Sequence, residues 1–349
     1  MPSHQRTFES RIDYSLLLPV LLLLSIGVTA IYIAVSHDYP NNALQIVSQQ
    51  VAWILLGFLI SFIVMFFNTK FLWIMTPLLY ILGLGLMILP LIFYSESLVA
   101  STGAKNWVAI HGVTLFQPSE FMKISYILML SRVVVKFLQQ NKNYERTLAL
   151  DFFLIVKLAL YTLPVLFLLA LQSDLGTALV FAAIYCGIVL LSGVSWKIIL
   201  PIFLTVSLLF TVFMLIFISD GGRAFLHSLG MPTYQINRIS AWLHPFEYAQ
   251  TITYQQAQGQ IAIGSGGLLG QGFNVSNLLV PVRESDMIFT VIAEDFGFLG
   301  SSLVIVIYLF LIHRMLQITI KSNNQFYTYI STGLIMMLLF HIFENIGAV

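Results

Sequence analysis

Four carboxylates lie close together between residues 281 and 300, where a polar loop runs into an apolar stretch. They are Glu284, Asp286, Glu294 and Asp295. A carboxylate can serve as a general base that removes a proton from a hydroxyl group. Asp286 stands where the apolar stretch begins, so water and an amphiphilic substrate would both reach it, and we predict that it is the catalytic base. Glu284 is the rival, whereas Glu294 and Asp295 are about two helical turns deeper and would organise the helix.

The composition indicates the environment of these carboxylates. Of the 349 residues, 58% are hydrophobic and only 9% are charged, and the mean hydropathy is +0.91. These values exclude a soluble globular domain and indicate a polytopic membrane protein, in which unpaired ionised groups are costly and usually functional. The net charge of +1 gives no attraction to nucleic acid, and the single cysteine, Cys186, excludes a disulfide framework.

Nine apolar runs are about as long as a helix that crosses a membrane. The alternating pattern of a membrane barrel is absent, so an all-α fold is expected. We expect one transmembrane domain over residues 1–349, with a large extracellular loop at residues 219–285 between the seventh and eighth spans. The expected spans are residues 14–35, 44–67, 71–94, 118–137, 152–171, 175–191, 198–218, 287–312 and 325–349.

The distribution of Lys and Arg predicts the orientation, because basic residues are enriched in cytoplasmic loops. With the N-terminus inside, eleven of the sixteen basic residues are cytoplasmic, four are external and Lys123 falls within a span. The external four are Lys105, Arg223, Arg238 and Arg283. The two longest polar segments, residues 95–117 and 219–285, then face outward, so we expect recognition or chemistry on the external face.

The long external loop is expected to contain short interfacial helices near residues 238–243 and 254–263. A glycine cluster follows at residues 264–272. We interpret it as a tight turn that permits close backbone approach. A compatible alternative is that its backbone N–H groups meet a lipid-linked pyrophosphate.

A second group of polar residues begins the fourth predicted span. Glu120 and Lys123 are three residues apart and would share one face of a helix. They form either a structural ion pair or the lining of a cavity that receives an anionic head group. Trp107 suits an interfacial anchor better than a ligand platform. Asp174 is expected to cap a helix, with substrate contact as the alternative. The histidines show no metal-ligand spacing and are interpreted as loop or packing residues.

Five motifs in this order resemble those of the shape, elongation, division and sporulation family, and the resemblance covers essentially the whole chain. Its rod-shape branch is the most similar. The motifs are Gly-Ala-Lys-Asn-Trp at 103–107, Gln-Pro-Ser-Glu at 117–120 with Lys123, Gln-Ser-Asp-Leu-Gly-Thr at 172–177, Ile-Ala-Ile-Gly-Ser-Gly-Gly at 261–267, and Ser-Asp-Met-Ile-Phe at 285–289 with Ala293 and Glu294.

The resemblance implies a ten-helix peptidoglycan glycosyltransferase of the bacterial cytoplasmic membrane. Such an enzyme polymerises lipid II outside the membrane and works with a class B penicillin-binding protein. The family's essential aspartate falls on Asp286. No cofactor is required by this expectation, although a divalent cation, Mg²⁺ or Mn²⁺, is a candidate to compensate the charge of the leaving group. The predicted substrate-binding residues are Lys105, Trp107, Gln117, Ser119, Glu120, Lys123, Arg238, Ser265 and Glu294.

Several positions depart from the family's pattern. Asn106 stands where arginine is common, Ser173 where proline is common and Val282 where glutamate is common, while residues 273–277 lack the usual Gly-Thr-Gln. The implied tenth helix would lie beyond Val349. Two alternatives stay open: a transporter that flips lipid-linked precursors, and a truncated inactive scaffold for a penicillin-binding protein. A transporter predicts polar residues throughout the bilayer depth, whereas here they gather near the external side.

Overall fold

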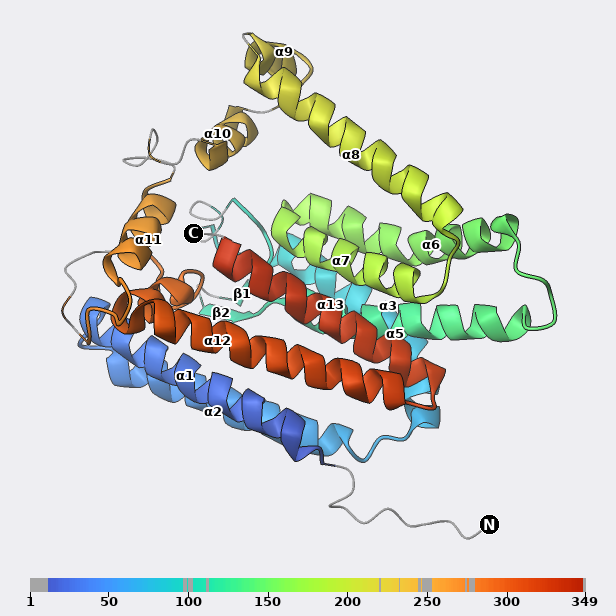
Figure 1. Ribbon diagram of the computed structural model, residues 1–349, viewed down its shortest axis with the longest axis horizontal. Coiled ribbons are helices and arrows are strands. Elements are labelled where there is room, and N and C mark those ends of the chain that lie inside the picture. Colours follow the sequence, from blue (N-terminus) through green and yellow to red (C-terminus); the bar gives the residue numbers. More distant parts are fainter. Residues whose placement is uncertain are drawn as a thin grey trace. The chain divides into compact units, whose positions relative to one another are not determined.

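The computed structural model describes residues 12–96, 99, 103–110, 113–219, 221–231, 233–243, 246, 253–273, 275 and 280–347. All nine predicted spans form helices (Figure 1). They are α1 (Tyr14–Asp38), α2 (Ala43–Val64), α3 (Thr69–Ile92), α5 (Pro118–Gln140), α6 (Leu148–Gln172), α7 (Leu175–Leu191), α8 (Trp196–Ile218), α12 (Ile288–Lys321) and α13 (Gln325–Gly347).

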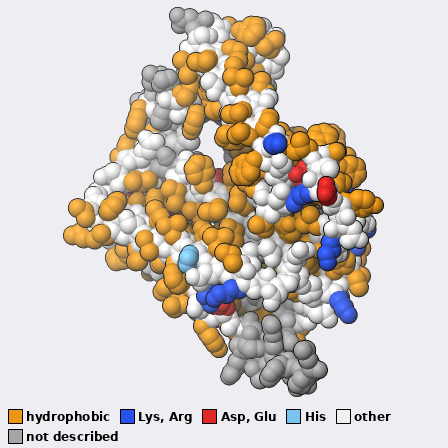
Figure 2. All heavy atoms as spheres, turned by 45° about the vertical axis from the view of Figure 1, so that its right-hand side comes forward, with side chains coloured by type: hydrophobic (Ala, Val, Ile, Leu, Met, Phe, Trp, Pro, Cys, Tyr) orange, Lys and Arg blue, Asp and Glu red, His pale blue; other side chains and the backbone are white. Residues whose placement is uncertain are grey.

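Seven of these helices are long and apolar enough to cross a membrane, within the part of the chain that the structure describes. The other two are α5 and α7. Helix α7 is shorter, at 17 residues. Helix α5 carries Glu120, Lys123, Arg132 and Lys136, which lower its hydropathy. Many large apolar side chains of these helices are exposed, and orange side chains cover much of the face seen in Figure 2. This apolar surface is the one that lipid would cover.

The long polar segments between the spans contain more structure than the sequence predicted. The two expected short helices are present as α10 (Thr233–Leu243) and α11 (Tyr254–Ser265), and a further helix, α9 (Gly222–Ser228), precedes them. A small antiparallel hairpin joins β1 (Val108–Ile110) to β2 (Val113–Phe116) before α5 begins. The all-α class holds, with this hairpin as an addition that the sequence analysis did not foresee.

The chain forms two compact units. The first unit comprises Met1–Val64, Phe203–Arg314 and Ile342–Val349, and the second comprises Met65–Ile202 and Met315–His341. Helices α8, α12 and α13 each contribute to both units. The expectation of a single transmembrane domain stays a prediction.

In the second unit, α5 is the central helix and packs against α3, α6 and α7. Its side chains are buried along most of its length, and the Tyr126 hydroxyl lies 2.8 Å from that of Thr162 on α6. Gly83 of α3 permits the close approach of α5, since a Cβ atom there would lie only 2.6 Å from the Met122 sulfur. Small residues at helix contacts are typical of membrane bundles.

In the first unit, small residues of α1 pack against α12. Ala30 and Ala34 are buried in one apolar cluster with Val291 and Val304. Asp13 caps the start of α1 by accepting a hydrogen bond from the Leu16 N–H at 3.1 Å. The Arg314 guanidinium donates a hydrogen bond to Asp13 at 2.7 Å, which ties the start of α1 to α12. The same hydrogen bond holds the pKa of Asp13 below its ordinary value.

Helix α12 changes direction within its first three turns. At Gly297 the φ angle is +64° and ψ is −160°, a conformation that only glycine adopts readily. This bend separates the segment that carries Glu294 from the longer apolar segment that follows. The bend is therefore part of the architecture that positions the carboxylates of the first unit.

Candidate active site

Asp286 lies in the turn that leads into α12. Its side chain is exposed, and its backbone carbonyl accepts a hydrogen bond from the Asn345 amide at 3.0 Å, which fixes the turn against the end of α13. Among the residues that the structure describes, no donor reaches the Asp286 carboxylate. Its oxygens can therefore accept a proton from a hydroxyl group that approaches from outside the protein.

The other three carboxylates of this segment have different surroundings. Glu284 is half-buried, with Oε2 covered and without a hydrogen-bond donor among the described residues. Glu294 and Asp295 are buried, at 2% and 9% exposure. Of the four residues only Asp286 is exposed, so this geometry favours it over the half-buried Glu284 as the group that meets an acceptor hydroxyl.

Glu294 belongs to a buried charge cluster around Arg283, which the sequence analysis did not identify as a site residue. Arg283 is 4% exposed, and its guanidinium makes a two-pronged contact with Asp38, with Nε to Oδ2 at 2.7 Å and Nη2 to Oδ1 at 3.0 Å. Its Nη1 lies 3.7 Å from Oε2 of Glu294, and His37 Nδ1 lies 2.8 Å from Oδ1 of Asp38. Arg283 thus joins the Asp286 turn to the end of α1 and to α12.

The backbone next to Arg283 is strained. Val282 has a φ of +56°, which is unusual for any residue except glycine and costs most for a β-branched side chain. Such strain persists only where the surroundings impose it, and it is found preferentially at functional sites. Here the buried ion pairs of Arg283 on one side and Pro281 on the other hold the turn in this conformation.

The glycine cluster forms the tight turn that the sequence predicted, and it packs directly on α12. The N–H groups of Gln271 and Gly272 donate to the carbonyls of Glu294 and Asp295, at 2.9 and 3.2 Å. The N–H of Gly270 bonds to Gly266 at 2.8 Å. Because these three N–H groups already have acceptors, they are not open to a pyrophosphate in this structure.

Ser265, a predicted substrate-binding residue within this cluster, ends α11. Its hydroxyl donates to the Ala262 carbonyl within the same helix at 2.7 Å. The side chain is half-buried. Its contact with substrate stays a prediction.

In the second unit, Glu120 and Lys123 form the predicted ion pair, at 2.7 Å from Nζ to Oε1. The Glu120 side chain is 61% exposed, whereas that of Lys123 is 2% exposed. The Lys123 ammonium also lies 2.9 Å from Nε2 of His341 on α13. Lys123 is therefore beneath Glu120 and does not itself line an open surface. His341 is therefore a third member of this pair. The sequence did not indicate it, because the histidines show no metal-ligand spacing.

Asp174 caps α7, as predicted, by accepting a hydrogen bond from the Thr177 N–H at 3.1 Å. Its other oxygen accepts from the Asn106 amide at 2.8 Å and lies 3.5 Å from the Gln117 amide nitrogen. Asp174 thereby gathers the loop before β1, the start of α5 and the start of α7. Asn106, which stands where arginine is common in the family, is thus one of the donors to Asp174.

Lys105 and Trp107 flank Asn106 on the same loop. The Lys105 N–H donates to the Gln172 carbonyl at 2.8 Å, and its ammonium lies 4.5 Å from the centre of the Tyr94 ring. Trp107 is 42% exposed. Both side chains are at the protein surface, where they can act as an anchor in the membrane interface or contact a substrate.

Two further predicted site residues remain. The Ser119 hydroxyl is buried, and no partner reaches it among the described residues. The backbone of Arg238 lies in α10, but its side chain falls outside the description. The described residues bring no three His, Cys, Asp or Glu side chains together in a way that could hold a metal ion. The divalent cation stays a prediction.

The predicted site residues thus form two groups. Asp286, Glu294 and Ser265 belong to the first unit, together with the Arg283 cluster. The second unit contains Gln117, which Asp174 contacts, and the ion pair of Glu120 and Lys123. Arg283, Asp38 and His341 are the members that sequence spacing could not identify.

Known proteins match the chain over nearly its full length. The probable peptidoglycan glycosyltransferase FtsW of Lactococcus lactis is 28% identical, over 96% of this chain and 83% of that protein. The peptidoglycan glycosyltransferase MrdB of Escherichia coli is 29% identical, over 99% of this chain and 86% of that protein. The stage V sporulation protein E of Bacillus subtilis is 25% identical, over 97% and 87%.

Solved structures share the fold. A chain from a peptidoglycan synthase complex superposes with a TM-score of 0.72 at 23% identity, covering 96% of this chain and 86% of that one. The rod shape determining protein RodA of Thermus thermophilus gives a TM-score of 0.60 at 23% identity, over 96% and 84%. The family model for FtsW, RodA and SpoVE, described as cell cycle protein, matches residues 14–349. The chain is thus a multi-pass membrane protein that belongs to the FtsW, RodA and SpoVE family.

Proposed function

We propose that the protein is a peptidoglycan glycosyltransferase that polymerises lipid II into glycan strands on the outer face of the bacterial cytoplasmic membrane. Curated relatives over the full length of the chain are named for this activity. The observation that carries the proposal is the exposed carboxylate of Asp286, free of donors among the described residues and held at the mouth of α12 by the buried Arg283 cluster.

The proposed reaction transfers one proton, forms one bond and releases one leaving group. Asp286 takes the proton from the acceptor sugar hydroxyl while the oxygen of that hydroxyl attacks the anomeric carbon of the donor. A carbon–oxygen bond forms there, and the bond from that carbon to the pyrophosphate oxygen breaks. The bonding electron pair leaves with the undecaprenyl pyrophosphate, which therefore gains negative charge and requires stabilisation.

We assign Lys123 a supporting role in the second unit, where from its buried position it balances the charge of Glu120. An ammonium group has three N–H donors, and Glu120 and His341 occupy two of them. The exposed Glu120 would repel a pyrophosphate if it were unpaired, and Lys123 neutralises it from beneath.

The charge distribution supports an orientation with the N-terminus in the cytoplasm, because basic residues favour that side. We infer from this orientation that the Asp286 turn and the hairpin face outward, where lipid II is consumed. We further infer a class B penicillin-binding protein as partner, which would contact the apolar outer surface of the helices through its own membrane span. Surrounding membrane lipids complete the environment, and no nucleic acid takes part.

The test is polymerisation of purified lipid II by the purified chain in detergent. Detergent micelles have no two sides, so flipping cannot produce a signal, whereas a glycosyltransferase makes glycan chains that gel electrophoresis resolves. Chain formation is expected and should increase when the penicillin-binding partner is added. Failure to form chains with and without the partner, together with transfer of lipid II across vesicle membranes, would favour a transporter instead.

A further inference from the structure

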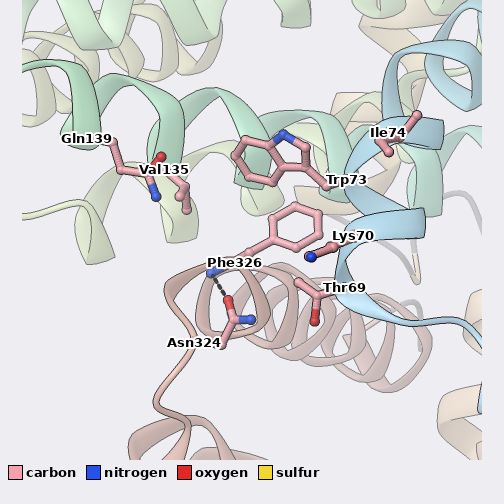
Figure 3. Close-up of a pocket in the computed structure, with 8 residues that line it drawn as sticks. All are labelled: Thr69, Lys70, Trp73, Ile74, Val135, Gln139, Asn324 and Phe326. Carbon is pink, nitrogen blue, oxygen red and sulfur yellow. Dashed lines mark hydrogen bonds between the residues drawn. The ribbon is translucent and has the colours of Figure 1, made fainter.

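A cavity of about 420 Å³ lies in the second unit where α3 and α13 begin and α5 ends (Figure 3). This volume is within the range of small-molecule sites in proteins. Its lining residues come from all three helices, and it is separate from the residues of the candidate active site. They are Thr69, Lys70, Trp73, Ile74, Val135, Gln139, Asn324 and Phe326.

The inner wall of the cavity is apolar and rigid. Trp73 is held from two sides: Phe326 packs edge-on against its ring at 5.1 Å between centroids, and the Arg132 guanidinium lies 5.3 Å from the ring centre. Arg132 also donates to the Trp73 carbonyl at 2.6 Å. Val135 and Phe326 are buried, at 3% and 2% exposure. An apolar chain could therefore enter a preformed space.

The cavity is open toward the membrane. Ile74, on the same helix as Trp73, is 64% exposed and belongs to the outer surface of α3 that lipid would cover. Thr69 and Lys70 are in the first turn of this helix, where the polar boundary of the membrane is expected. The opening thus spans the level at which a phospholipid changes from head group to acyl chain.

The polar rim carries hydrogen-bond donors and no carboxylate. Lys70 is exposed and has no ion-pair partner among the described residues. Asn324 uses its carbonyl oxygen to accept the Phe326 N–H at 2.9 Å, and Figure 3 shows its amide nitrogen turned toward the side where Thr69 and Lys70 lie. An ammonium, an amide N–H₂ and a hydroxyl are the donors that phosphate oxygens accept.

We propose that this cavity binds an anionic phospholipid, with one acyl chain against Trp73 and Phe326 and the head-group phosphate held by Lys70 and Asn324. The charge selects the anionic class, because basic pockets between membrane helices attract negatively charged head groups. The lipid would bind where three helix ends meet, and would stabilise their packing. This site is additional to the lipid II site and has no part in the glycosyl transfer.

The test uses the full chain in phosphatidylcholine vesicles that contain a minor fraction of lipid brominated on its acyl chains. Bromine quenches nearby tryptophan, and the difference between the wild type and Trp73→Phe isolates the Trp73 signal from that of the other four tryptophans. Brominated phosphatidylglycerol is compared with brominated phosphatidylcholine. One lysine gives about a fivefold preference for phosphatidylglycerol over phosphatidylcholine. The fraction of brominated phosphatidylglycerol that quenches half of the Trp73 signal should therefore be about one fifth of the fraction of brominated phosphatidylcholine that does so.

Lys70→Gln should remove this preference, whereas Lys197→Gln, a matched loss of one exposed lysine on α8, a helix that contributes no lining residue, should leave it unchanged. Equal quenching by both lipids in the wild type would mean that only an unselective apolar chain enters, and would overturn the proposal. Absence of Trp73 quenching, or a preference that survives Lys70→Gln, would also overturn it. If Trp73→Phe does not fold, as judged by the loss of its helical circular dichroism signal, the test uses native mass spectrometry instead. The wild type should then retain more phosphatidylglycerol than Lys70→Gln does, and equal retention would overturn the proposal.

Discussion

The buried ammonium of Lys123 lies 2.9 Å from Nε2 of His341, a residue 218 positions away in the sequence. An ammonium can only donate, whereas a ring nitrogen that carries no proton can accept, so this contact can supply the buried cation with an acceptor. The histidine therefore completes the environment of a cation that Glu120 alone would leave partly unsatisfied.

His341→Leu should destabilise the protein by about 1–3 kcal/mol, because it leaves a buried donor without its acceptor. His341→Gln offers a carbonyl oxygen and should retain most of the stability. Thermal unfolding in detergent, followed by circular dichroism, measures both variants. Equal melting temperatures for His341→Leu and the wild type would show that the contact is not formed in solution.

Asp286→Asn should lower lipid II polymerisation by about a hundredfold or more, because the amide keeps the shape of the side chain but cannot take up a proton. The matched variant Glu284→Gln should retain activity. Both are compared at equal amounts of folded protein in the chain-forming assay. Loss of activity in the Glu284 variant, with near-normal chains from the Asp286 variant, would mean that Glu284 and not Asp286 is the catalytic base.

Arg283→Met should destabilise the protein by about 3–5 kcal/mol, since it strands Asp38 and Glu294 as buried charges without their cation. Arg223→Met, which removes an exposed arginine from α9, is the control and should unfold at nearly the wild-type temperature. The measurement is the melting temperature of each purified variant. A similar small shift in both would mean that Arg283 is hydrated and not part of a buried cluster.

Gly270→Ala should destabilise the turn on α12. The φ angle of Gly270 is +87°, and a Cβ atom there would lie 2.1 Å from the Asp295 carbonyl oxygen. The control is Gly264→Ala, in α11, where a Cβ atom meets nothing within 4 Å and the change should stabilise the helix by up to about 1 kcal/mol. Limited proteolysis of the purified variants in detergent measures both effects. Equal protection of the two variants would contradict the packing described here.

Ser173 ends α6 with a φ of +59°. Ser173→Gly should stabilise the protein by about 0.5–1 kcal/mol, because glycine adopts this conformation without steric cost. Ser173→Pro should destabilise it by about 3 kcal/mol, since proline cannot adopt a positive φ and lacks the N–H that bonds to Ala170. Unfolding temperatures test the pair, and tolerance of proline would indicate a different backbone at this turn.

The sequence by itself determined the membrane class, the nine helices and the exposed position of Asp286. These depend on local properties: a helix that crosses a membrane needs a long apolar run, and a carboxylate at the start of such a run stays near water. The cap formed by Asp174 and the ion pair of Glu120 with Lys123 were also predictable, because both involve residues within one helical turn. The family motifs in the chain pointed to the same fold.

Only the tertiary structure decided which distant charges meet. Arg283 contacts Asp38 across 245 residues, and the contact between Lys123 and His341 likewise leaves no periodic trace in the sequence. The burial of Lys123 beneath Glu120, and the use of the glycine N–H groups by α12, depend on which helix faces which neighbour. Local propensity and spacing set where a helix begins and ends, whereas the packing of its faces selects its long-range partners.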